Sequence, residues 1–237
     1  MRKAFDVIKH DILLAKLESY SIKGNTLQWF NSYLLARSQF VVCRDSASEV
    51  PQSPFGVPQG SVLGPTLFNI HINNISKACH NSDVALFADY TEIHFSSKDV
   101  GEAEYRINED LKSVNKWFSN NGLICNTTKT VTMVIALNRE VKTARDVRIS
   151  YGDSLLEQKR SFKYLIVIVD ESLPWNSHRS YVASRVYPKL KLLNRISSFL
   201  DPITLLKIST IVPILDYGCK FTGAKELMEQ VTYGLMA

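Results

Sequence analysis

The most constraining feature of the sequence is a pair of short β-prone runs, residues 84–87 and 90–95, joined by only two residues. Two such runs with a two-residue connection predict an antiparallel β-hairpin. The connection holds one carboxylate, Asp89, next to Ala88. Turn formation alone would explain an aspartate at this place. A metal ligand held at the end of two strands would also explain it, but such a ligand needs a second charged group nearby.

Helical and strand patterns surround this hairpin. The clearest is an amphipathic helix that begins at residue 100 and ends at the Asn-Asn-Gly of residues 120–122; its apolar residues recur at helical spacing, as in Leu111, Val114 and Phe118. Further helices are predicted over residues 10–22, 25–37, 62–75, 180–200 and 201–215. Strands are predicted over residues 2–8, 38–45, 130–137, 147–152 and 162–169.

The order of these elements is mixed, which predicts an α+β fold rather than a strictly alternating one. We expect a mixed domain over residues 1–172 and a helical region over residues 173–237. Hydrophobic residues make up 45% and charged residues 22% of the 237 residues. This composition allows a packed core and argues against general disorder.

The charge of the chain is unevenly distributed. The formal net charge is +5, and basic residues outnumber acidic ones between Arg139 and Arg195. Such a segment is explained either by solvated helix faces or by a surface that contacts nucleic acid. The charge pattern alone leaves both explanations open.

The cysteines and the apolar runs bear on location. The four cysteines are scattered and form no Cys-x-x-Cys pair, which argues against a zinc site, a disulfide scaffold and a disulfide-linked partner. No apolar segment follows Met1, so no signal peptide is expected. The longest apolar run, residues 164–169, is too short to cross a bilayer. We therefore expect an intracellular protein, cytoplasmic or nuclear, without a membrane partner.

The best partner for Asp89 is Asp6, a carboxylate within the apolar run of residues 4–8. If both lie on neighbouring strands, the two charges repel each other unless a cation lies between them. Mg²⁺ suits such a place, because it takes carboxylate oxygens and completes its shell with water and phosphates. Two ordinary turn or strand-end aspartates are the alternative that this pattern leaves open.

A third feature is the loop of residues 56–64, which leads into the predicted helix. Gly56, Gly60 and Gly64 allow a close approach of the backbone to a flat or phosphorylated ligand. Gln59 offers a donor and an acceptor at the tip of the loop. Ser61 is expected to cap the helix, with a proline in its first turns. The glycines and prolines would equally shape an ordinary tight connection.

Three runs, at these separations, resemble the reverse transcriptases of non-long-terminal-repeat (LINE-like) retrotransposons: AFD, GVPQGSVLGPTLF and LFAD. The similarity continues through LICNTTKTVTMVI, FKYLIVIVDESLPWNSH and the helical C-terminal region, so it covers nearly the whole chain. The resemblance implies a right-hand polymerase palm with an antiparallel sheet, followed by a helical thumb. It also implies an RNA template, a DNA primer and deoxynucleotides as substrates, with two Mg²⁺ ions as cofactor.

The resemblance assigns roles to particular residues. Asp6 and Asp89 match the two metal-binding catalytic aspartates. Pro58, Gln59 and Gly60 match the substrate-binding loop that lies against the incoming deoxynucleotide and the template–primer.

Three further residues receive roles by the same resemblance. Lys129 matches a catalytic lysine that helps to protonate the pyrophosphate leaving group, although a solvated turn lysine is the alternative. Phe5 and Phe87 match packing residues that hold the aspartates in place.

The chain also departs from the family pattern. Tyr90 stands where the family has a second hairpin aspartate, and a phenol is a poor magnesium ligand beside a carboxylate. Residues 7–10 read Val-Ile-Lys-His where the family tends to have a hydroxyl residue and then Val-Asp-His. Ile166 replaces the glycine of a Tyr-Leu-Gly-Val turn, where positive φ would strain a β-branched residue. Because little sequence precedes Asp6, the fingers subdomain is expected to be missing.

These departures predict a degenerate palm and thumb that is inactive by itself, a pseudoenzyme of retrotransposon origin. Two alternatives stay open. One is a non-catalytic nucleic-acid-binding module, and the other is a non-functional retroelement relic.

Overall fold

The computed structural model describes residues 1–35, 37–38, 40–44, 46–49, 54–136, 146–196 and 211–217. The chain divides into two compact units. Unit 1 comprises Met1–Val131 and Asp146–Glu157, and unit 2 comprises Thr132–Arg145 and Gln158–Ala237. The strands after residue 158 therefore group with the helix that follows them. The predicted division into a palm, residues 1–172, and a thumb, residues 173–237, is a functional one and stays a prediction.

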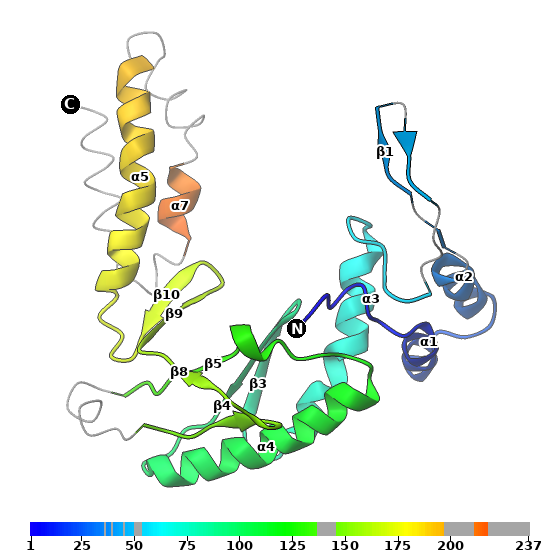
Figure 1. The fold of residues 1–237 in the computed structure, drawn as a ribbon, viewed down its shortest axis with the longest axis horizontal. Coiled ribbons are helices and arrows are strands. Elements are labelled where there is room, and N and C mark those ends of the chain that lie inside the picture. Colours follow the sequence, from blue (N-terminus) through cyan, green and yellow to red (C-terminus); the bar gives the residue numbers. More distant parts are fainter. Residues whose placement is uncertain are drawn as a thin grey trace. The chain divides into compact units, whose positions relative to one another are not determined.

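Unit 1 carries helices and short antiparallel ladders, so the mixed α+β class is confirmed (Figure 1). Its helices are α1 (His10–Ser19), α2 (Gly24–Leu34), α3 (Leu63–Ile72) and α4 (Val100–Asn120), with 3₁₀ turns η1 (Asn73–Ala78) and η2 (Thr127–Lys129). Its strands are β1 (Val42–Cys43), β2 (Ser46–Ala47), β3 (Asp83–Phe87), β4 (Tyr90–His94), β6 (Ser150–Tyr151) and β7 (Ser154–Leu155). Strands β5 (Val131–Thr132) and β8 (Glu157–Gln158) lie where the chain passes between the units.

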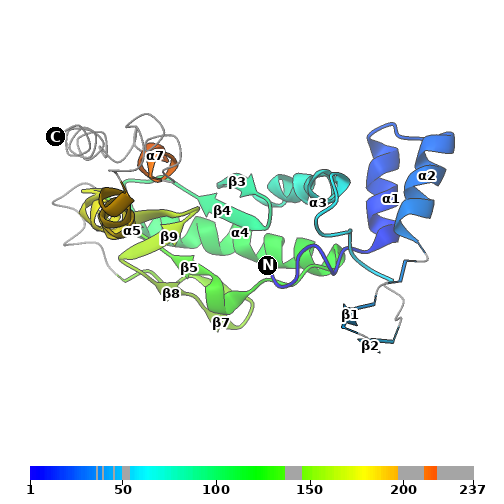
Figure 2. The same cartoon turned by 90° about the horizontal axis from the view of Figure 1, so that it is seen from above.

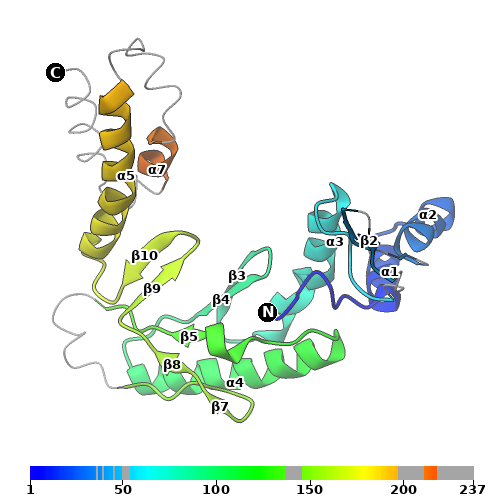
Figure 3. The same ribbon diagram turned by 45° about the horizontal axis from the view of Figure 1, so that its top comes forward.

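The predicted hairpin forms as strands β3 and β4, in antiparallel register with Phe87 opposite Tyr90. Side chains of a strand alternate between its two faces. Val84, Leu86 and Ile93 therefore share one face and pack on the core of the unit. Helix α4, drawn below the hairpin in Figure 3, contributes Val114 and Phe118 to that core. Phe87 lies on the opposite face and is 61% exposed. The expectation that Phe87 packs to hold the aspartate was wrong, because the alternation of β3 turns it outward.

Helix α4 forms as predicted. Asp99 caps it by accepting a hydrogen bond from the Gly101 amide at 2.9 Å. Leu111, Val114 and Phe118 are buried on its inner face. The helix is followed by Gly122, whose φ of +70° suits a glycine after the last turn. Local sequence signals therefore account for the whole element.

Helices α1, α2 and α3 also form, and they surround the main core of unit 1. Figure 2 shows α1 and α2 side by side, and both α2 and α3 contact α1. Helix α3 begins at Leu63, two residues after the predicted cap, and the Gly64 amide donates to Ser61 Oγ at 3.0 Å. Leu67 and Phe68 of α3 are fully buried in this core. The core thus holds the first helix turn of α3, and with it the preceding loop, against α1.

The strand predicted over residues 2–8 does not form. Residues 3–6 make a turn instead, closed by a 2.9 Å hydrogen bond from the Asp6 amide to the Lys3 carbonyl. Ala4 and Ile8, four residues apart, are the two buried apolar side chains of this segment. A buried strand face would also include the alternate residue Asp6, but Asp6 is exposed. Asp6 therefore lies in a turn and not within a buried strand.

Other predicted strands are shorter in the structure than in the sequence pattern. The patterns over residues 38–45, 130–137 and 147–152 give only the two-residue strands β1, β5 and β6. Residues 39, 45 and 137 lie outside the described residues.

Unit 2 contains the hairpin β9 (Ser161–Tyr164) and β10 (Val167–Asp170), helix α5 (Asn176–Ile196) and helix α7 (Val212–Asp216). The pattern over residues 162–169 thus folds as a hairpin and not as one strand. Its turn residues, Leu165 and Ile166, have φ of +44° and +74°. The left-handed conformation costs a residue with a Cβ roughly 1–2 kcal/mol. The strain expected from Ile166 in place of glycine is therefore present.

Helix α5 packs on α7 through buried Val182, Val186, Ile211 and Leu215. The helix predicted over residues 180–200 begins earlier, at Asn176. Residues 197–210 lie outside the described residues, so most of the helix predicted over 201–215 does too. No helix in the described ranges is long and apolar enough to cross a membrane.

Candidate active site

Asp6 is held by backbone hydrogen bonds between its turn and the loop of residues 56–57. The Gly56 amide donates to the Ile8 carbonyl, and the Val57 amide donates to the Phe5 carbonyl, each at 2.8 Å. Gly56 has a φ of +85°, and a Cβ built on it would lie 2.8 Å from Asp6 Cα and from the Phe5 carbonyl oxygen. Only glycine combines this conformation with this closeness. Gly56 therefore fixes the loop against the backbone of Asp6.

His10 supports the same loop from helix α1. Its ring is buried, and Nε2 lies 2.8 Å from the Gly56 carbonyl oxygen. The carbonyl can only accept, so the Nε2–H tautomer donates this bond. The sequence analysis missed this role. The signal was a histidine that opens a helix four residues after Asp6, but its partner is 46 residues away.

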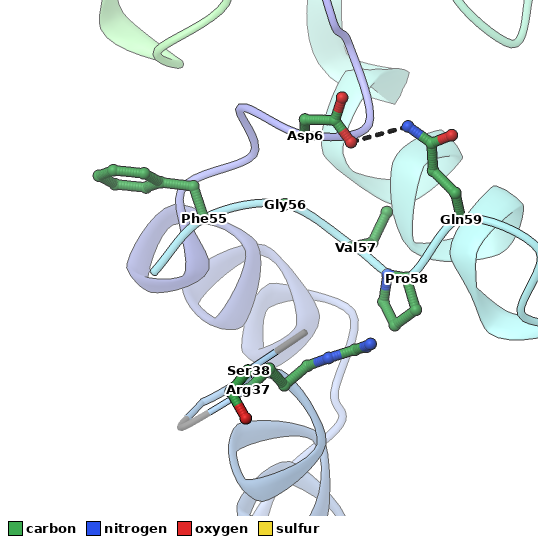
Figure 4. Close-up of a pocket in the computed structure, with 8 residues that line it drawn as sticks. All are labelled: Asp6, Arg37, Ser38, Phe55, Gly56, Val57, Pro58 and Gln59. Carbon is green, nitrogen blue, oxygen red and sulfur yellow. Dashed lines mark hydrogen bonds between the residues drawn. The ribbon is translucent and has the colours of Figure 1, made fainter. Parts of the chain in front are cut away.

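Gln59 links the loop to the carboxylate. Its Nε2 donates to Asp6 Oδ1 at 2.7 Å (Figure 4). Gly60, with φ +79°, has open space where a Cβ would stand. The Pro58 carbonyl accepts from the Ser61 hydroxyl at 2.8 Å, which ties the loop to the start of α3. The structure thus brings the predicted residues 58–60 next to Asp6.

Two cavities meet at this loop. The first, of about 460 Å³, is lined by Asp6 together with Arg37 and residues 55–59. The second, of about 370 Å³, is lined by Asp89 together with Lys3, Phe5 and residues 58–60. Pro58 and Gln59 line both cavities. The two predicted metal-binding aspartates therefore lie around one glutamine, although they come from segments more than 80 residues apart.

The surroundings of the two aspartates differ. Asp6 is exposed, and its neighbour Phe5 stacks on Phe68 with ring centroids 4.6 Å apart, so the predicted packing role of Phe5 is confirmed. Asp89 is half-buried in the hairpin turn, after Ala88 with a φ of +49°. Tyr90 is 47% exposed on the outward face. The position in the strand sets the face on which a side chain stands, so an aspartate at position 90 would stand on that same outward face.

Lys129 is not brought to this place. It is an exposed residue in the 3₁₀ turn η2, and it lines neither of the two cavities. Its role in protonating a leaving group stays a prediction that rests on the resemblance.

The donor set suits magnesium with few protein ligands. In the described part of the chain, no group of three or more acidic, histidine or cysteine side chains converges on one point. Magnesium, however, is commonly held by one or two carboxylates, with water and substrate phosphates completing the shell. Asp6 and Asp89 are carboxylates of this kind, and they line two separate cavities that share Pro58 and Gln59.

A buried polar cluster lies at the junction of α1, α3 and α4. Lys16 Nζ donates to the His71 carbonyl, to Asn74 Oδ1 at 3.0 Å and to Asn121 Oδ1 at 2.6 Å. Burial lowers the pKa of Lys16 to about 8. Burial, followed by the charge of Lys16, outweighs a smaller raising effect of the Asn121 backbone and lowers the pKa of His71 to about 4. This cluster couples the packing of the site's helices to pH.

Asp110 on α4 holds the segment that leads into β3. Its buried carboxylate accepts hydrogen bonds from the His80, Asn81 and Ser82 amides and from Asn81 Nδ2, at 2.8–3.3 Å. Burial raises the pKa of this carboxyl, but these hydrogen bonds outweigh it and lower the pKa below its ordinary value. Asp110 therefore anchors the hairpin that carries Asp89.

Residues 1–169 match the family model for reverse transcriptase (RNA-dependent DNA polymerase). The chain belongs to the reverse transcriptase family. The match includes Asp6, the loop of residues 56–60 and Asp89, and it confirms the resemblance that the sequence motifs indicated.

Curated relatives come from insect mobile elements. The chain is 30% identical, over 94% of its length, to a probable RNA-directed DNA polymerase from transposon BS of Drosophila melanogaster. It is 26% identical, also over 94% of its length, to the RNA-directed DNA polymerase from mobile element jockey of the same species. A Pol polyprotein from the R1 element of Nasonia vitripennis is 31% identical over 60% of the chain. The chain spans 26%, 25% and 35% of these relatives, respectively.

Proposed function

We propose that this reverse transcriptase family chain carries the nucleotidyl-transfer site of an RNA-directed DNA polymerase of LINE-like retrotransposon origin. The observation that supports it most is that Asp6 and Asp89 line adjoining cavities that share Pro58 and Gln59. The proposed substrates are an RNA template, a DNA primer and deoxynucleotides.

Each residue of the site has a role in this proposal. Asp6 and Asp89 would hold Mg²⁺, which when bound supplies charge neutralisation of the nucleotide phosphates. Gln59 orients the Asp6 carboxylate through its 2.7 Å hydrogen bond. Gly60 leaves room above the loop for a strand or a nucleotide, since no atom lies within 4 Å of the position of a Cβ. Lys129 is the proposed proton donor to the leaving group.

We further propose that Tyr90 makes the site inactive or nearly so. The phenol replaces a carboxylate ligand at the first residue of β4, directly after Asp89. Displacement of a reacting group by about 1 Å can cost on the order of a hundredfold in rate. Loss of one ligand therefore weakens both the binding and the placement of a metal.

Primer extension on an RNA template, with Mg²⁺ and then Mn²⁺, tests both proposals. The proteins to compare are the natural chain, Tyr90→Asp and the double variant Tyr90→Asp/Asp6→Ala. Asp83→Ala, made in the Tyr90→Asp background, is the matched control, because it removes an exposed carboxylate from the same hairpin.

We expect extension by Tyr90→Asp that Asp6→Ala abolishes and Asp83→Ala preserves. Extension by the natural chain at the level of Tyr90→Asp would contradict the proposed role of Tyr90. Extension that persists without the Asp6 carboxylate would overturn the assignment of the site. If none of these proteins extended the primer, the result would favour the second function, which is described next.

The second candidate is a non-catalytic nucleic-acid-binding module, and helix α5 favours it. This helix of 21 residues has five basic and no acidic side chains: Arg179, Arg185, Lys189, Lys191 and Arg195. On the same helix, Tyr181 OH accepts a 2.7 Å hydrogen bond from Lys163 of β9, which lowers the pKa of the phenol. Basic side chains beside an aromatic ring suit the phosphates and bases of nucleic acid.

Salt-dependent binding of an RNA–DNA hybrid separates the two functions. Each lost phosphate contact should weaken binding. It should also reduce, by about one, the slope of the logarithm of the binding constant against the logarithm of the salt concentration. We expect this of Lys191→Gln and Arg195→Gln, with no change in Asp6→Ala. Hybrid binding that is equal in the helix α5 variants and the natural chain would exclude this helix as the contact surface.

A further inference from the structure

The first cavity contains one basic side chain, to which neither the motifs nor the comparisons give a role. Of the side chains that line it, Asp6 and Arg37 carry charge, and the charges are opposite. Figure 4 shows the two on opposite sides of the loop, with the Arg37 guanidinium extended toward Pro58. Within the described part of the chain, Arg37 forms no ion pair. The cavity therefore has an acidic end that is suited to a cation and a basic end that is suited to an anion.

The Arg37 guanidinium is positioned by an aromatic stack on helix α2. Its Cζ lies 5.8 Å from the centroid of the Tyr33 ring. Tyr33 is stacked on Trp29, with centroids 5.4 Å apart and an interplanar angle of 11°. Trp29 and Tyr33 are four residues apart and therefore lie on one face of the helix. Arg37 follows the end of the helix at Leu34. Leu34 is fully buried and fixes this helix to the core.

The chemistry of this arrangement favours phosphate. A guanidinium binds phosphate through two parallel N–H···O bonds, and stacking on a ring leaves its edge donors available. The cavity volume of about 460 Å³ lies within the range of small-molecule sites.

We propose that Arg37, held in place by Tyr33, binds a phosphate group of the substrate in the cavity that contains Asp6. This inference rests on the proposed function, because it concerns the same cavity. The phosphate belongs either to a deoxynucleoside triphosphate or to the backbone of a nucleic-acid strand. Both sources have the same chemistry, so the experiment has to separate them.

The experiment is isothermal titration calorimetry of the full chain with dTTP, thymidine and an RNA–DNA template–primer, with and without Mg²⁺. Arg37→Gln removes the charge, and Arg37→Lys keeps the charge but not the planar fork. Tyr33→Leu removes the ring under the guanidinium, and Tyr33→Phe restores it. Arg148→Gln is the matched control, because Arg148 is an exposed arginine of the same unit.

We expect Arg37→Gln to weaken dTTP binding by about 10- to 100-fold and to leave thymidine binding unchanged. Arg37→Lys and Tyr33→Leu should give smaller losses, and Tyr33→Phe and Arg148→Gln should match the natural chain. Tyr33→Leu and Tyr33→Phe both keep Arg37, so a loss of binding in Tyr33→Leu alone would show that the aromatic ring positions the guanidinium. A loss confined to the template–primer would support phosphate binding and identify a strand as its source.

Two results would overturn the inference. One is equal binding of dTTP and template–primer by Arg37→Gln and the natural chain. The other is an equal loss in Arg148→Gln, which would mean that general charge and not this cavity is responsible. Failure of the proposed catalytic function is a separate result: Arg37-dependent binding would persist while every variant stayed silent in primer extension.

Discussion

The contact between Gly56 and Asp6 leads to a prediction that two glycines of one loop can test together. Gly56 and Gly60 have nearly the same conformation, with φ of +85° and +79°. They differ in surroundings, because a Cβ on Gly56 would lie 2.8 Å from backbone atoms of Phe5 and Asp6, whereas a Cβ on Gly60 would meet no atom within 4 Å. Alanine at the two positions therefore has the same conformational cost and a different steric cost.

The magnitudes follow from these surroundings. Positive φ costs alanine roughly 1–2 kcal/mol, partly offset by about 0.4–1 kcal/mol from the reduced entropy of the unfolded chain. Gly60→Ala should therefore lower the free energy of unfolding by about 1 kcal/mol. Gly56→Ala should cost about 1–3 kcal/mol more, because backbone atoms have to move apart. The difference between the two variants measures the close approach of the loop to Asp6.

Urea denaturation and hydrogen exchange provide the assay. The exchange of the Val57 amide, which donates to the Phe5 carbonyl at 2.8 Å, should become faster in Gly56→Ala and stay nearly unchanged in Gly60→Ala. Gly56→Ala should also weaken the Asp6–Gln59 contact, because the turn that carries Asp6 moves away. Equal destabilisation by both variants, with equal protection of Val57, would refute the reasoning.

Three further predictions concern stability. Ile166→Gly should raise the free energy of unfolding by about 0.5–1 kcal/mol, because it relieves a φ of +74° at a residue that is 57% exposed. Ile166→Ala should give a smaller gain, because alanine keeps a Cβ. Equal thermal midpoints for the two variants would contradict this. The pKa of His71 in the folded chain, about 4, is below its ordinary 6.5, so the unfolded chain binds the proton more readily. The free energy of unfolding should therefore fall as pH drops from about 6.5 to 4, by up to roughly 3 kcal/mol. His71→Leu should flatten that part of the profile in urea denaturation, and an unchanged slope would exclude His71 as its cause. Asp110→Ala should lower the free energy of unfolding by about 3 kcal/mol, because it leaves the amides before β3 without an acceptor. The pKa of Asp110 is lowered in the folded chain, so the natural chain should begin to lose the stability linked to this carboxylate only as pH falls below about 4. A loss of less than about 1 kcal/mol in Asp110→Ala would mean that water replaces the carboxylate.

Elements with strong local signals were predictable from the sequence. Helix α4 has a continuous apolar face and an Asn-Asn-Gly at its end, and the structure follows both signals. The β3–β4 hairpin follows from two β-prone runs with a two-residue connection. Such elements are specified within about twenty residues, so their pattern is a sufficient guide.

The sequence was less informative where apolar residues have no local partner. Residues 2–8 have the composition of a strand, but no segment among the described residues pairs with them as a ladder, and a turn buries Ala4 and Ile8 instead. Phe87 is apolar in sequence, yet the register of its hairpin turns it outward. Composition specifies what a segment can bury, whereas tertiary packing decides whether it does so as a strand or a turn.

The candidate site shows the same division. The motifs indicated Asp6, Gln59 and Asp89, and the family match includes all three positions. No motif assigned a role to His10 or Arg37, because their importance lies in contacts with the distant loop at residues 55–59. A glycine without a Cβ allows that loop to approach Asp6. Helix α1 places His10 beside the loop, and Arg37 follows helix α2, whose last residue, Leu34, is buried in the core. The sequence by itself therefore determined the chemistry of the groups, and only the tertiary structure decided which of them share a cavity, because contacts between distant segments depend on how the core is packed.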